Sequence, residues 1–574
     1  MSTKRAEYVS CEERARQYPK GTLHADSGKL FCSCCNITLD HTRKGTIDRH
    51  LESLVHVSKR KASEEAQDKK AKKQATVAGM FSRHTEARDA RNVAVFELVE
   101  AFTAANIPLE KLDHPSLHSY LHNHISNLGL LPASQHLRTD YQQKVFENHK
   151  EQLKAFLSAA SSVAIVTDEA SDAQDRFGLH ILFTPEVDTT SELSPAAYLA
   201  DIVYLEKVNA VTVSQAVLTC VANMGVSYNN VSAFVTDNAS YMSKAFQNMT
   251  GILPNAVHCT CNAHILSLVG ETWRKNFKDV DRLVALFKSI FTYCSARKRR
   301  YKEFLAEKTG TDEVPLPPVP VVTRWNSWFK TVIHHAKYVA FYKDFVDEEL
   351  DIGDATNALT ELKEHLQDPA VVAEDVNFVA ASALKLVELL TWFESSIHQA
   401  YNRVTDLLAW AEYEANSATV DKYKKAFKDT ADKLSQYYRP TSRSRFTQPG
   451  LDFLKAVRVF DFKQVSLLPC DELIKMIPGA DNRHVLAEFA AYKAMAGDVP
   501  SETTVVSFWH ASSDRFPLLS RLALRYLSVP TNSVDAERSV SQYTTVSAPQ
   551  RQRLSTSNLA NQVIVAKNSK TGIA

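Results

Sequence analysis

Five short apolar runs, interleaved with two segments of helical periodicity, set the strongest limit on how this chain can fold. Short apolar runs bounded by turn residues are typical of strands buried in a sheet. Three such runs come first, and a helical segment then precedes each of the last two. The order predicts an α/β domain built on one five-stranded sheet. The predicted strands are 161–168, 178–183, 198–206, 230–237 and 255–261, and the predicted helices are 211–226 and 239–249.

Two of these predicted strands end on an aspartate, Asp168 in the first and Asp237 in the fourth. The order is that of the RNase H-like fold, in which these strands are neighbours, so we expect the two carboxylates to converge. Converging carboxylates repel each other unless a cation neutralises them, and hard oxygen ligands favour Mg²⁺ or Mn²⁺. The alternative is that each aspartate only caps the following turn. Three nearby acids are interpreted as loop carboxylates that tune the local potential: Glu169, Asp172 and Asp175.

A third carboxylate, Glu537, stands near the C-terminus at the start of a predicted helix. Asn532 or Ser533 can cap this helix, and acidic groups in its first turns suit the helix dipole. Taken alone, Glu537 is a charge at a solvated helix start. We nevertheless predict that the chain returns it to the two aspartates as a third metal ligand. Asp535 projects about 200° away around the helix and is expected to point elsewhere.

The composition is that of a globular protein with several domains. The chain has 574 residues, 44% hydrophobic and 23% charged, which predicts three or four domains. The net charge is +1, so any nucleic-acid surface must come from local clusters of charge. Nine cysteines do not make a disulfide scaffold and indicate a reducing compartment. Without a long apolar run or a signal peptide, we expect no membrane partner and no secretion by that route.

Residues 20–60 have the pattern of a small zinc finger. A Cys-x2-Cys pair follows an apolar strand, and a His-x5-His pair follows on a predicted helix. A segment this small cannot stabilise itself by burial alone, and this layout suits a tetrahedral Zn²⁺ site. The predicted ligands are Cys32, Cys35, His50 and His56, with Cys34 as a rival thiolate and His41 as a further candidate.

Basic residues surround and follow the predicted finger. Arg43, Lys44 and Arg49 are expected to contact DNA phosphates. Two basic clusters, 59–61 and 69–73, have the spacing of a bipartite nuclear localisation signal, so we predict a nuclear protein. The alternative is a solvated, charged linker.

The residues after this linker have helical periodicity as far as residue 157, which predicts a bundle that binds DNA or a second copy of the chain. Plain core packing is the alternative. Residues 28–61, GKLFCSCCNITLDHTRKGTIDRHLESLVHVSKRK, resemble the CGG triplet repeat-binding protein family and the BED-type fingers of hAT transposases. Residues 96–141 resemble the helical half of the first of these families. The resemblance implies a DNA-binding N-terminal region.

The stretch from about residue 273 to 507 is again helical in pattern and predicts a large all-α insertion. Its basic cluster 297–302 is interpreted either as a DNA-backbone contact or as a solvated face. A proline-rich stretch, 316–320, leads into Arg324 and Trp325. This pair can set a guanidinium on a phosphate and an indole under a base; core packing is the alternative for the tryptophan.

Motifs spread over residues 150–574 resemble the hAT transposase family. The C-terminal part, from Trp509 to Ser555, resembles the dimerisation region of that family. Where the family often has Gly-Trp-Thr after the first acid, this chain has Glu169-Ala-Ser. The matching motifs are Asp168 after a strand, Val-Thr-Asp237-Asn-Ala-Ser, Cys261-x-x-His264, Thr-Arg324-Trp325-Asn-Ser and Ser-Val-Asp-Ala-Glu537-Arg-Ser.

The resemblance implies a role for each matching residue. Asp168, Asp237 and Glu537 would form the catalytic, metal-binding triad. His264 and Arg324 would lie near the scissile phosphate, and Trp325 would stack on a flipped base. Cys261 is expected to support this corner rather than to react. A second zinc site formed by His258, Cys259, Cys261 and His264 is a less favoured alternative.

Together these patterns predict an α+β multidomain protein with an RNase H-like catalytic domain interrupted by an all-α insertion. The predicted function is that of a cut-and-paste hAT transposase, acting as a homodimer or larger homo-oligomer on terminal inverted repeats and target DNA. One alternative is a host-adopted, catalytically idle transcriptional regulator; a simple RNase H-like nuclease explains the acids but not the finger. The predicted parts are a finger (1–62), a basic linker (63–80), a helical domain (81–157), the first catalytic part (158–272), the insertion (273–507) and the dimerisation region with the final catalytic part (508–574).

Overall fold

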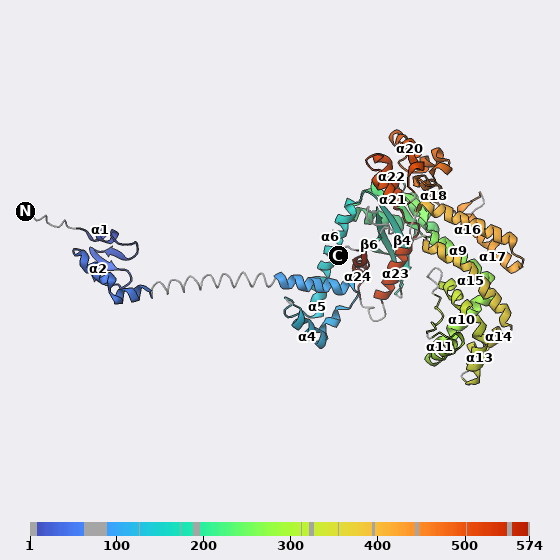
Figure 1. The fold of residues 1–574 in the computed structure, drawn as a ribbon, viewed down its shortest axis with the longest axis horizontal. Helices are drawn as coiled ribbons and strands as arrows, with labels where there is room; N and C mark the ends of the chain where they lie inside the picture. The colour runs from blue at the N-terminus through green and yellow to red at the C-terminus, as the bar shows by residue number, and fades with distance from the viewer. Residues whose placement is uncertain are drawn as a thin grey trace, which may run out of the picture. The chain divides into compact units, whose positions relative to one another are not determined.

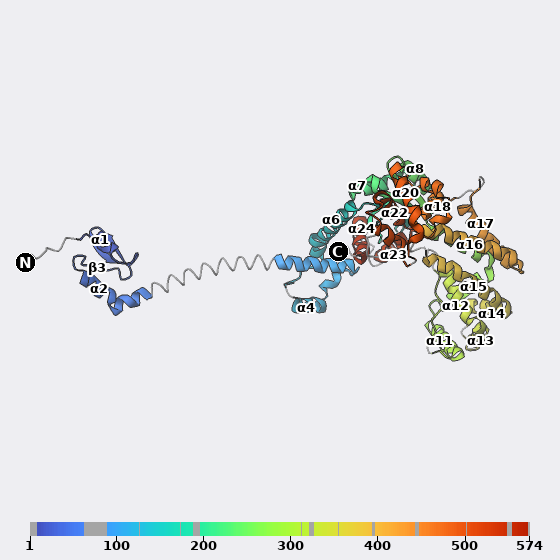
Figure 2. The same cartoon turned by 45° about the horizontal axis from the view of Figure 1, so that its top comes forward.

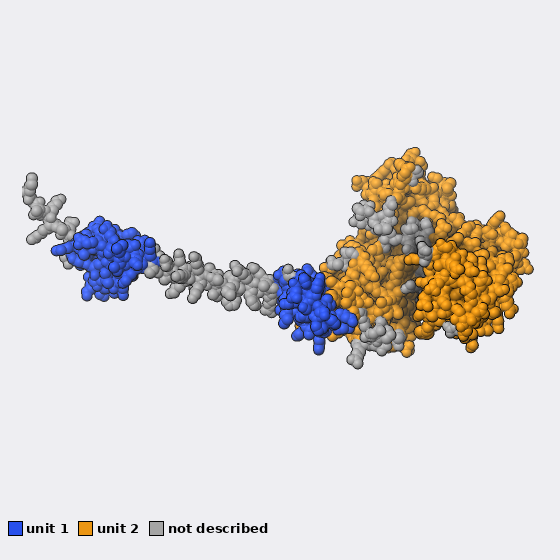
Figure 3. Space-filling model, turned by 60° about the horizontal axis from the view of Figure 1, so that its bottom comes forward, with its two compact units in different colours: residues 1–99, 110–136 blue, residues 100–109, 137–574 orange. Residues whose placement is uncertain are grey.

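The computed structural model divides the chain into two compact units, residues 1–99 with 110–136 and residues 100–109 with 137–574 (Figure 3). Three predicted features lie outside the described residues: the basic cluster 69–73, Arg324 and Trp325. No helix in the described part is both long and apolar enough to cross a lipid bilayer. The structure describes residues 9–61, 89–125, 127–172, 174–186, 196–311, 313–320, 327–353, 355–392, 397–441, 447–500, 502–547 and 554–571.

The first folded segment is a three-stranded antiparallel sheet with two short helices, followed by a helical stretch at 54–61 that carries His56. Its first hairpin turns at Ser27 and Gly28, whose φ angles of 49° and 72° are those that a two-residue hairpin requires. Leu30 and Ile47 are fully buried in one small apolar core. The order strand, cysteine knuckle, helix is the order predicted for the finger. The elements are α1 (Cys11–Arg16), β1 (Leu23–Asp26), β2 (Lys29–Cys32), β3 (Thr38–Leu39) and α2 (Lys44–Glu52).

The region that follows is helical over its described residues, as its periodicity predicts. A helix covers residues 89–104. The Asp113 carboxylate accepts hydrogen bonds from the backbone N (2.8 Å) and the Oγ (2.5 Å) of Ser134, where the next helical turn begins. The other elements are η1 (Leu109–Asp113), α4 (Pro115–His124), α5 (Ser134–His136), η2 (Leu137–Gln142) and α6 (Gln143–Ala159).

A five-stranded mixed sheet forms the centre of the second unit, in the order β6-β5-β4-β7-β8. β4 pairs antiparallel with β5 and parallel with β7, so it is the central strand. Sequence reasoning ended this strand at Asp168, but β4 continues to Ser171, which pairs with Phe177. The strands are β4 (Val163–Ser171), β5 (Phe177–Pro185), β6 (Tyr198–Leu205), β7 (Val231–Thr236) and β8 (Val257–Thr260).

Both faces of this sheet are buried, as the continuous apolar runs predict. Along β4, Val163 and Ile165 enter one apolar core, and Ala164 and Val166 enter the other. The first core contains residues of α7 (Ala210–Asn223) and α8 (Ser240–Met249), and the second contains residues of α9 (Asn262–Asn276) and α23 (Val534–Val546). Figure 1 shows α23 beside β4.

A long all-helical stretch lies along the chain between α9 and α23. Helices α16 and α17 lie side by side in both ribbon views (Figures 1 and 2). Its helices are α10 (Lys278–Phe291), α11 (Ser295–Thr309), α12 (Ser327–Tyr338), η4 (Val339–Phe341), α13 (Tyr342–Asp351), α14 (Asn357–His365), α15 (Pro369–Trp392), α16 (Ile397–Ser417), α17 (Asp421–Tyr438), α18 (Leu451–Ala456), η5 (Val457–Phe460), η6 (Val465–Leu467), α19 (Cys470–Leu473), η7 (Ile474–Met476), α20 (Arg483–Met495), η8 (Ala496–Asp498), α21 (Val505–Ala511) and α22 (Pro517–Leu527).

Side-chain amides from later parts of the chain close both edges of the sheet. At β8, the Gln448 amide accepts from the backbone N of Thr260 (2.7 Å) and donates to its carbonyl oxygen (2.8 Å). At β6, the Asn568 amide does the same with Leu199, at 2.8 and 2.9 Å. Each amide thus replaces the partner that an edge strand lacks. Asn568 ends α24 (Thr556–Asn568), which is followed by η10 (Ser569–Thr571).

Candidate active site and zinc centre

The four predicted finger ligands come together. One ligand atom from each of Cys32, Cys35, His50 and His56 lies within 4.8 Å of the others. The Nδ1 of His56 is 3.3 Å from the Sγ of Cys32 and 3.5 Å from the Sγ of Cys35. The Nε2 of His50 is buried and has no hydrogen-bond partner among the described residues. Two thiols and two imidazoles at this spacing fit a tetrahedral Zn²⁺ ion, which would give that nitrogen its partner.

The structure also separates the alternatives that the spacing left open. Cys34 is half-buried and stands outside the four-residue cluster. His41 belongs to the loop before α2, where its carbonyl oxygen accepts a hydrogen bond from the Nε of Arg14 (2.8 Å). The predicted phosphate contacts, Arg43, Lys44 and Arg49, are exposed at the start of α2 and along it. The finger therefore presents cations on its helix while its ligands face inward.

The second cluster is built from three carboxylates that enter from three elements. Val166 of β4 pairs with Val235 of β7, and Asp168 and Asp237 each follow two residues later, so both lie at the same end and on the same face of the sheet. Glu537 lies in the first turn of α23, the helix that contacts β4 and β5. The backbone therefore carries Asp168 and Asp237 to the same edge of the sheet, and α23 brings Glu537 against the same strands.

Burial and the charge of a neighbouring acid raise the pKa of two of these acids, Asp168 and Glu537. Burial raises the pKa of Asp168 to about 7, and the charge of Asp237 adds to this effect. Burial raises the pKa of Glu537 to about 8, with a further contribution from Asp168. Carboxyl groups held in this way bind protons at neutral pH unless a cation takes the place of the protons. The donor set is oxygen only, which suits Mg²⁺ or Mn²⁺ rather than Zn²⁺.

Glu169 also belongs to this cluster, contrary to its interpretation as a loop residue. It lies within β4, where burial and the charges of Asp237 and Asp168 raise its pKa to about 8. Its Oε2 is buried and has no hydrogen-bond partner among the described residues. Among those residues, the finger is the cluster whose ligand atoms all lie within 4.8 Å of one another; the carboxylate cluster is wider.

The other two acids of this stretch have structural roles. Asp172 accepts hydrogen bonds from the Nε of Arg176 (2.6 Å) and from the hydroxyl of Tyr543 (2.8 Å). The arginine and tyrosine bonds hold the pKa of Asp172 below its usual value, although burial opposes them. Asp175 occupies the turn before β5, with a φ of 55°. Both acids lie in the connection between β4 and β5, as the interpretation of them as loop carboxylates expects.

Cys261 joins the start of α9 to the start of α23. Its Sγ accepts hydrogen bonds from the backbone N of His264 (3.3 Å) and of Ser533 (3.2 Å). The thiol is fully buried, and burial raises its pKa to about 12, so it supports this corner, as expected, and is not a nucleophile. His264 lies near Asp237; burial lowers its pKa and the aspartate opposes that shift. Asn532, not Ser533, supplies the side-chain cap of α23, by accepting from the backbone N of Val534 (2.9 Å).

The alternative second zinc site does not form among the described residues. The Nε2 of His258 lies 3.0 Å from the Oγ1 of Thr236, and the buried Cys259 belongs to the apolar core. No metal-ligand cluster involves either residue in the described part of the chain. Both therefore stabilise the packing of β8.

The basic cluster 297–302 is partly an internal ion-pair network. Arg297 is 2% exposed, and its Nε is 3.0 Å from the Oε2 of Glu349. Arg300 binds the same buried carboxylate through its Nε and a terminal nitrogen. These two arginines hold α11 against α13 and are not available to a DNA backbone.

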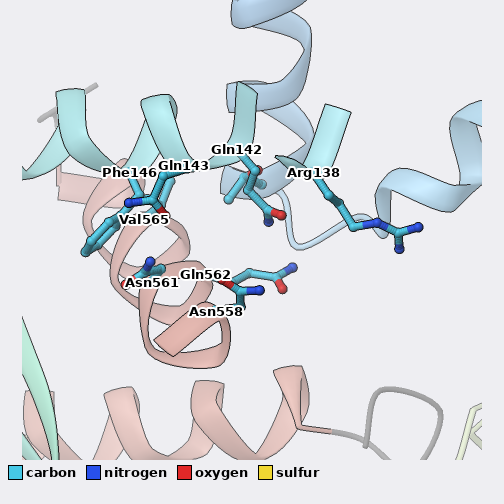
Figure 4. A pocket seen from close by; sticks show the side chains of 9 residues that line it. Arg138, Gln142, Gln143, Phe146, Asn558, Asn561, Gln562 and Val565 are labelled. Atoms are coloured by element: carbon cyan, nitrogen blue, oxygen red, sulfur yellow. The ribbon is translucent and has the colours of Figure 1, made fainter. Parts of the chain in front are cut away.

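A small hollow between α6 and α24 is lined mostly by amide side chains (Figure 4). Its volume is about 20 Å³, which is room for one water molecule. It is therefore no substrate site, and the two clusters above remain the candidates for function.

Comparison with known proteins agrees with this division of the chain. Residues 5–62 match the model of the CGGBP1 N-terminal domain, and residues 85–144 match the CGGBP1 helical domain. CGG triplet repeat-binding protein 1 of Mus musculus and that of Homo sapiens are each 38% identical to this chain over 153 residues, which are 90% of their length and 27% of this chain. The chain belongs to the family of these proteins.

The C-terminal part of the chain is similar to a different protein family. Residues 488–569 match the hAT family C-terminal dimerisation region. This match begins in α20 and contains both Glu537 and α24. The chain thus joins a CGG triplet repeat-binding-protein-like region to a hAT-type dimerisation region, with the five-stranded sheet and helices α9 to α19 between them.

Proposed function

We propose that the protein is a metal-dependent DNA transposase of the hAT type. The observation that supports the proposal is that Asp168 lies close enough to Asp237 and to Glu537 for their charges to interact, at one end of the sheet. The strand order β6-β5-β4-β7-β8, with three antiparallel strands followed by two parallel ones, supports the RNase H-like fold that the proposal requires. Separate elements that bring three half-buried acids to one edge of the sheet cost free energy unless a cation binds there.

The carboxylates would hold Mg²⁺ or Mn²⁺, with Glu169 as a neighbouring acid. A pair of such ions activates a water molecule and stabilises the leaving oxygen of a phosphodiester. In the proposed sequence one DNA strand is hydrolysed first, and the 3′-hydroxyl groups then form the flanking hairpin and join the element to its target. His264, close to Asp237, would contact the scissile phosphate. Arg324 and Trp325 keep the phosphate-binding and base-stacking roles that the resemblance implies.

The N-terminal region would bind DNA through its zinc finger. Arg43, Lys44 and Arg49 are exposed cations at one helix, which suits contacts to phosphates. The relatives are named for binding CGG triplet repeats. We infer that this chain also binds duplex DNA with its finger, acts in the nucleus and assembles through residues 488–569 into at least a homodimer.

A second candidate is a DNA-binding regulator of the same ancestry that does not cleave. Two observations favour it. The carboxylate cluster is wider than the zinc cluster, and the N-terminal match is to a family named only for DNA binding. Against it, Asp168, Asp237 and Glu537 are all present.

One experiment separates the two functions. The full-length, zinc-loaded protein is incubated with Mg²⁺ or Mn²⁺ and duplex DNA that carries the element ends with their flanks. The transposase yields hairpinned flanks and joined ends, and Asp168→Asn abolishes both while DNA binding remains. Binding by folded wild-type protein with no cleavage in either metal refutes the transposase and leaves the regulator.

A further inference from the structure

The helix that carries Glu537 docks on the sheet through a face that carries two hydroxyl groups. Its four most deeply buried side chains recur at helical spacing: Ala536, Ser539, Tyr543 and Val546. Two of the four are small, which lets α23 approach the strands closely, and two carry hydroxyl groups. Apolar packing alone therefore gives this face little to define its rotation.

Both hydroxyl groups meet polar partners on the sheet. The Oγ of Ser539, a fully buried residue, shares a hydrogen bond of 2.8 Å with the Nδ1 of His180 on β5. The hydroxyl of Tyr543 donates to the Oδ2 of Asp172 (2.8 Å), and its ring packs edge-on against His180 with 5.5 Å between centroids. The Tyr204 hydroxyl on β6 donates to Tyr543 at 3.3 Å.

His180 has no other evident task. It is fully buried, and burial lowers its pKa to about 3, so the ring is neutral at neutral pH. Its Nε2 is buried without a hydrogen-bond partner among the described residues. Burial of a polar ring with only one hydrogen-bonded nitrogen costs free energy. The contribution of His180 that offsets this cost is its hydrogen bond to Ser539.

The place of this bond links it to the carboxylates. His180 is the direct pairing partner of Asp168 across β4 and β5, so the two side chains share one face of the sheet. Ser539 lies two residues after Glu537 on α23. A slip of one residue on the helix turns it by about 100°, which would carry Glu537 away from Asp168.

We propose that His180 and Ser539 are positioning residues that fix the rotation of α23 and so aim Glu537 at Asp168. This role rests on the proposed function, because it concerns the same metal site. The two residues act through Glu537 and do not touch the ions or the DNA. Loss of such an outer partner lowers metal affinity by about 10- to 100-fold in known sites.

The test measures Mn²⁺ binding to the full-length, zinc-loaded protein by electron paramagnetic resonance, without DNA. Asp168→Asn defines the signal that belongs to the carboxylates. Ser539→Ala removes the hydroxyl with a minimal change of volume. Thr544→Ala is the matched control, since the exposed Thr544 hydroxyl donates only within the same helix, to the carbonyl oxygen of Val540 (3.1 Å).

We expect Ser539→Ala to weaken Asp168-dependent Mn²⁺ binding by about tenfold or more, while Thr544→Ala leaves it unchanged. His180→Leu should weaken it similarly, and His180→Asn should recover most of the affinity, because the Asn amide can take the position of Nδ1. Circular dichroism establishes that each variant keeps its helical content. DNA cleavage by the same variants should fall in parallel.

Two results would overturn the idea in distinguishable ways. Wild-type protein without any Asp168-dependent Mn²⁺ site refutes the proposed function, and the positioning role with it. A wild-type site that Ser539→Ala leaves at full affinity refutes the positioning role alone. The positioning role would also be refuted if His180→Asn bound Mn²⁺ as weakly as His180→Leu. The size of the side chain, and not the hydrogen bond, would then determine the Mn²⁺ affinity.

Discussion

Replacing Glu537 with glutamine should make the metal-free protein more stable while it abolishes cleavage. The folded chain holds Glu537 half-buried near Asp168, and its pKa rises from 4.5 to about 8. Within the part of the chain that the structure describes, no hydrogen bond reaches its carboxyl group, so the glutamine amide loses no partner there. The substitution replaces a carboxyl group, which the folded protein must keep protonated, by a neutral amide. It therefore also removes the repulsion between Glu537 and Asp168.

The magnitude follows from proton linkage. Above pH 4.5 the unfolded chain releases this proton while the folded chain retains it to about pH 8, so stability falls as pH rises through that window. Each pH unit is worth about 1.4 kcal/mol, which sets an upper limit of roughly 3 kcal/mol at pH 7. Water at the half-buried carboxyl reduces the expected gain to about 1–2 kcal/mol. Glu537 belongs to the larger compact unit, residues 100–109 with 137–574, and for a unit of that size the gain is a rise in midpoint of about 1–2 °C.

The assay is a thermal melt of wild type and Glu537→Gln from pH 5 to 8.5, without added divalent cation and with the zinc of the finger left in place. The difference in midpoint should be near zero at pH 5 and should grow to pH 8. Asp535→Asn is the matched control on the same helix turn. Asp535 forms ion pairs with Lys567 (3.2 Å) and Arg538 (3.5 Å), so its loss should not stabilise the protein.

With added Mn²⁺, wild type should melt at a higher temperature than Glu537→Gln, because the ion stabilises wild type and not the glutamine variant. The reasoning is refuted if Glu537→Gln melts at or below the wild-type temperature at every pH. It is also refuted if the gain does not depend on pH, since a general packing effect would then explain it.

Three other predictions follow from the same geometry. Cys35→Ser should remove zinc from the finger and weaken DNA binding, whereas Cys34→Ser should retain one zinc per chain, as measured by atomic absorption. Gly450→Ala should lower the melting midpoint, because an added Cβ would lie 2.6 Å from the Sγ of Cys259 and 2.7 Å from the carbonyl oxygen of His258; an unchanged midpoint would mean that β8 shifts freely. Mn²⁺ affinity of the wild-type protein should rise between pH 6 and 8.5, by up to about tenfold per pH unit for each proton displaced. The reason is that burial and repulsion raise the pKa values of Asp168 and Glu537 to about 7 and 8. Calorimetric titration would contradict this if the Mn²⁺ affinity did not change with pH.

The strand order was predictable from sequence because the strands are buried on both faces and read as continuous apolar runs. Asp168 and Asp237 were predictable for the same reason, since each polar residue interrupts or ends such a run. The zinc ligands followed from spacing, although three crowded cysteines left the choice of thiolates to the structure. In each case the sequence pattern that supports the prediction spans only a few neighbouring residues.

Other features depend on contacts that no local pattern carries. Glu169 looked like a loop acid because a strand that continues past its last apolar residue has no separate signal in sequence. His180 and Ser539 are 359 residues apart, and neither stands in a recognisable motif. The basic run at 297–302 could not reveal that Glu349, on another helix, buries Arg297.

The amides that close the two edges of the sheet have a consequence for synthesis of the protein. Gln448 and Asn568 both come after all five strands, and Asn568 lies 369 residues beyond its partner Leu199. Translation at about 5–20 residues per second needs roughly 20–75 s to cover that interval. Throughout it the nascent sheet has at least one bare edge, which can pair with a strand of another chain. Products truncated after β8 should therefore be cleared or aggregate, and not accumulate as inactive competitors on DNA.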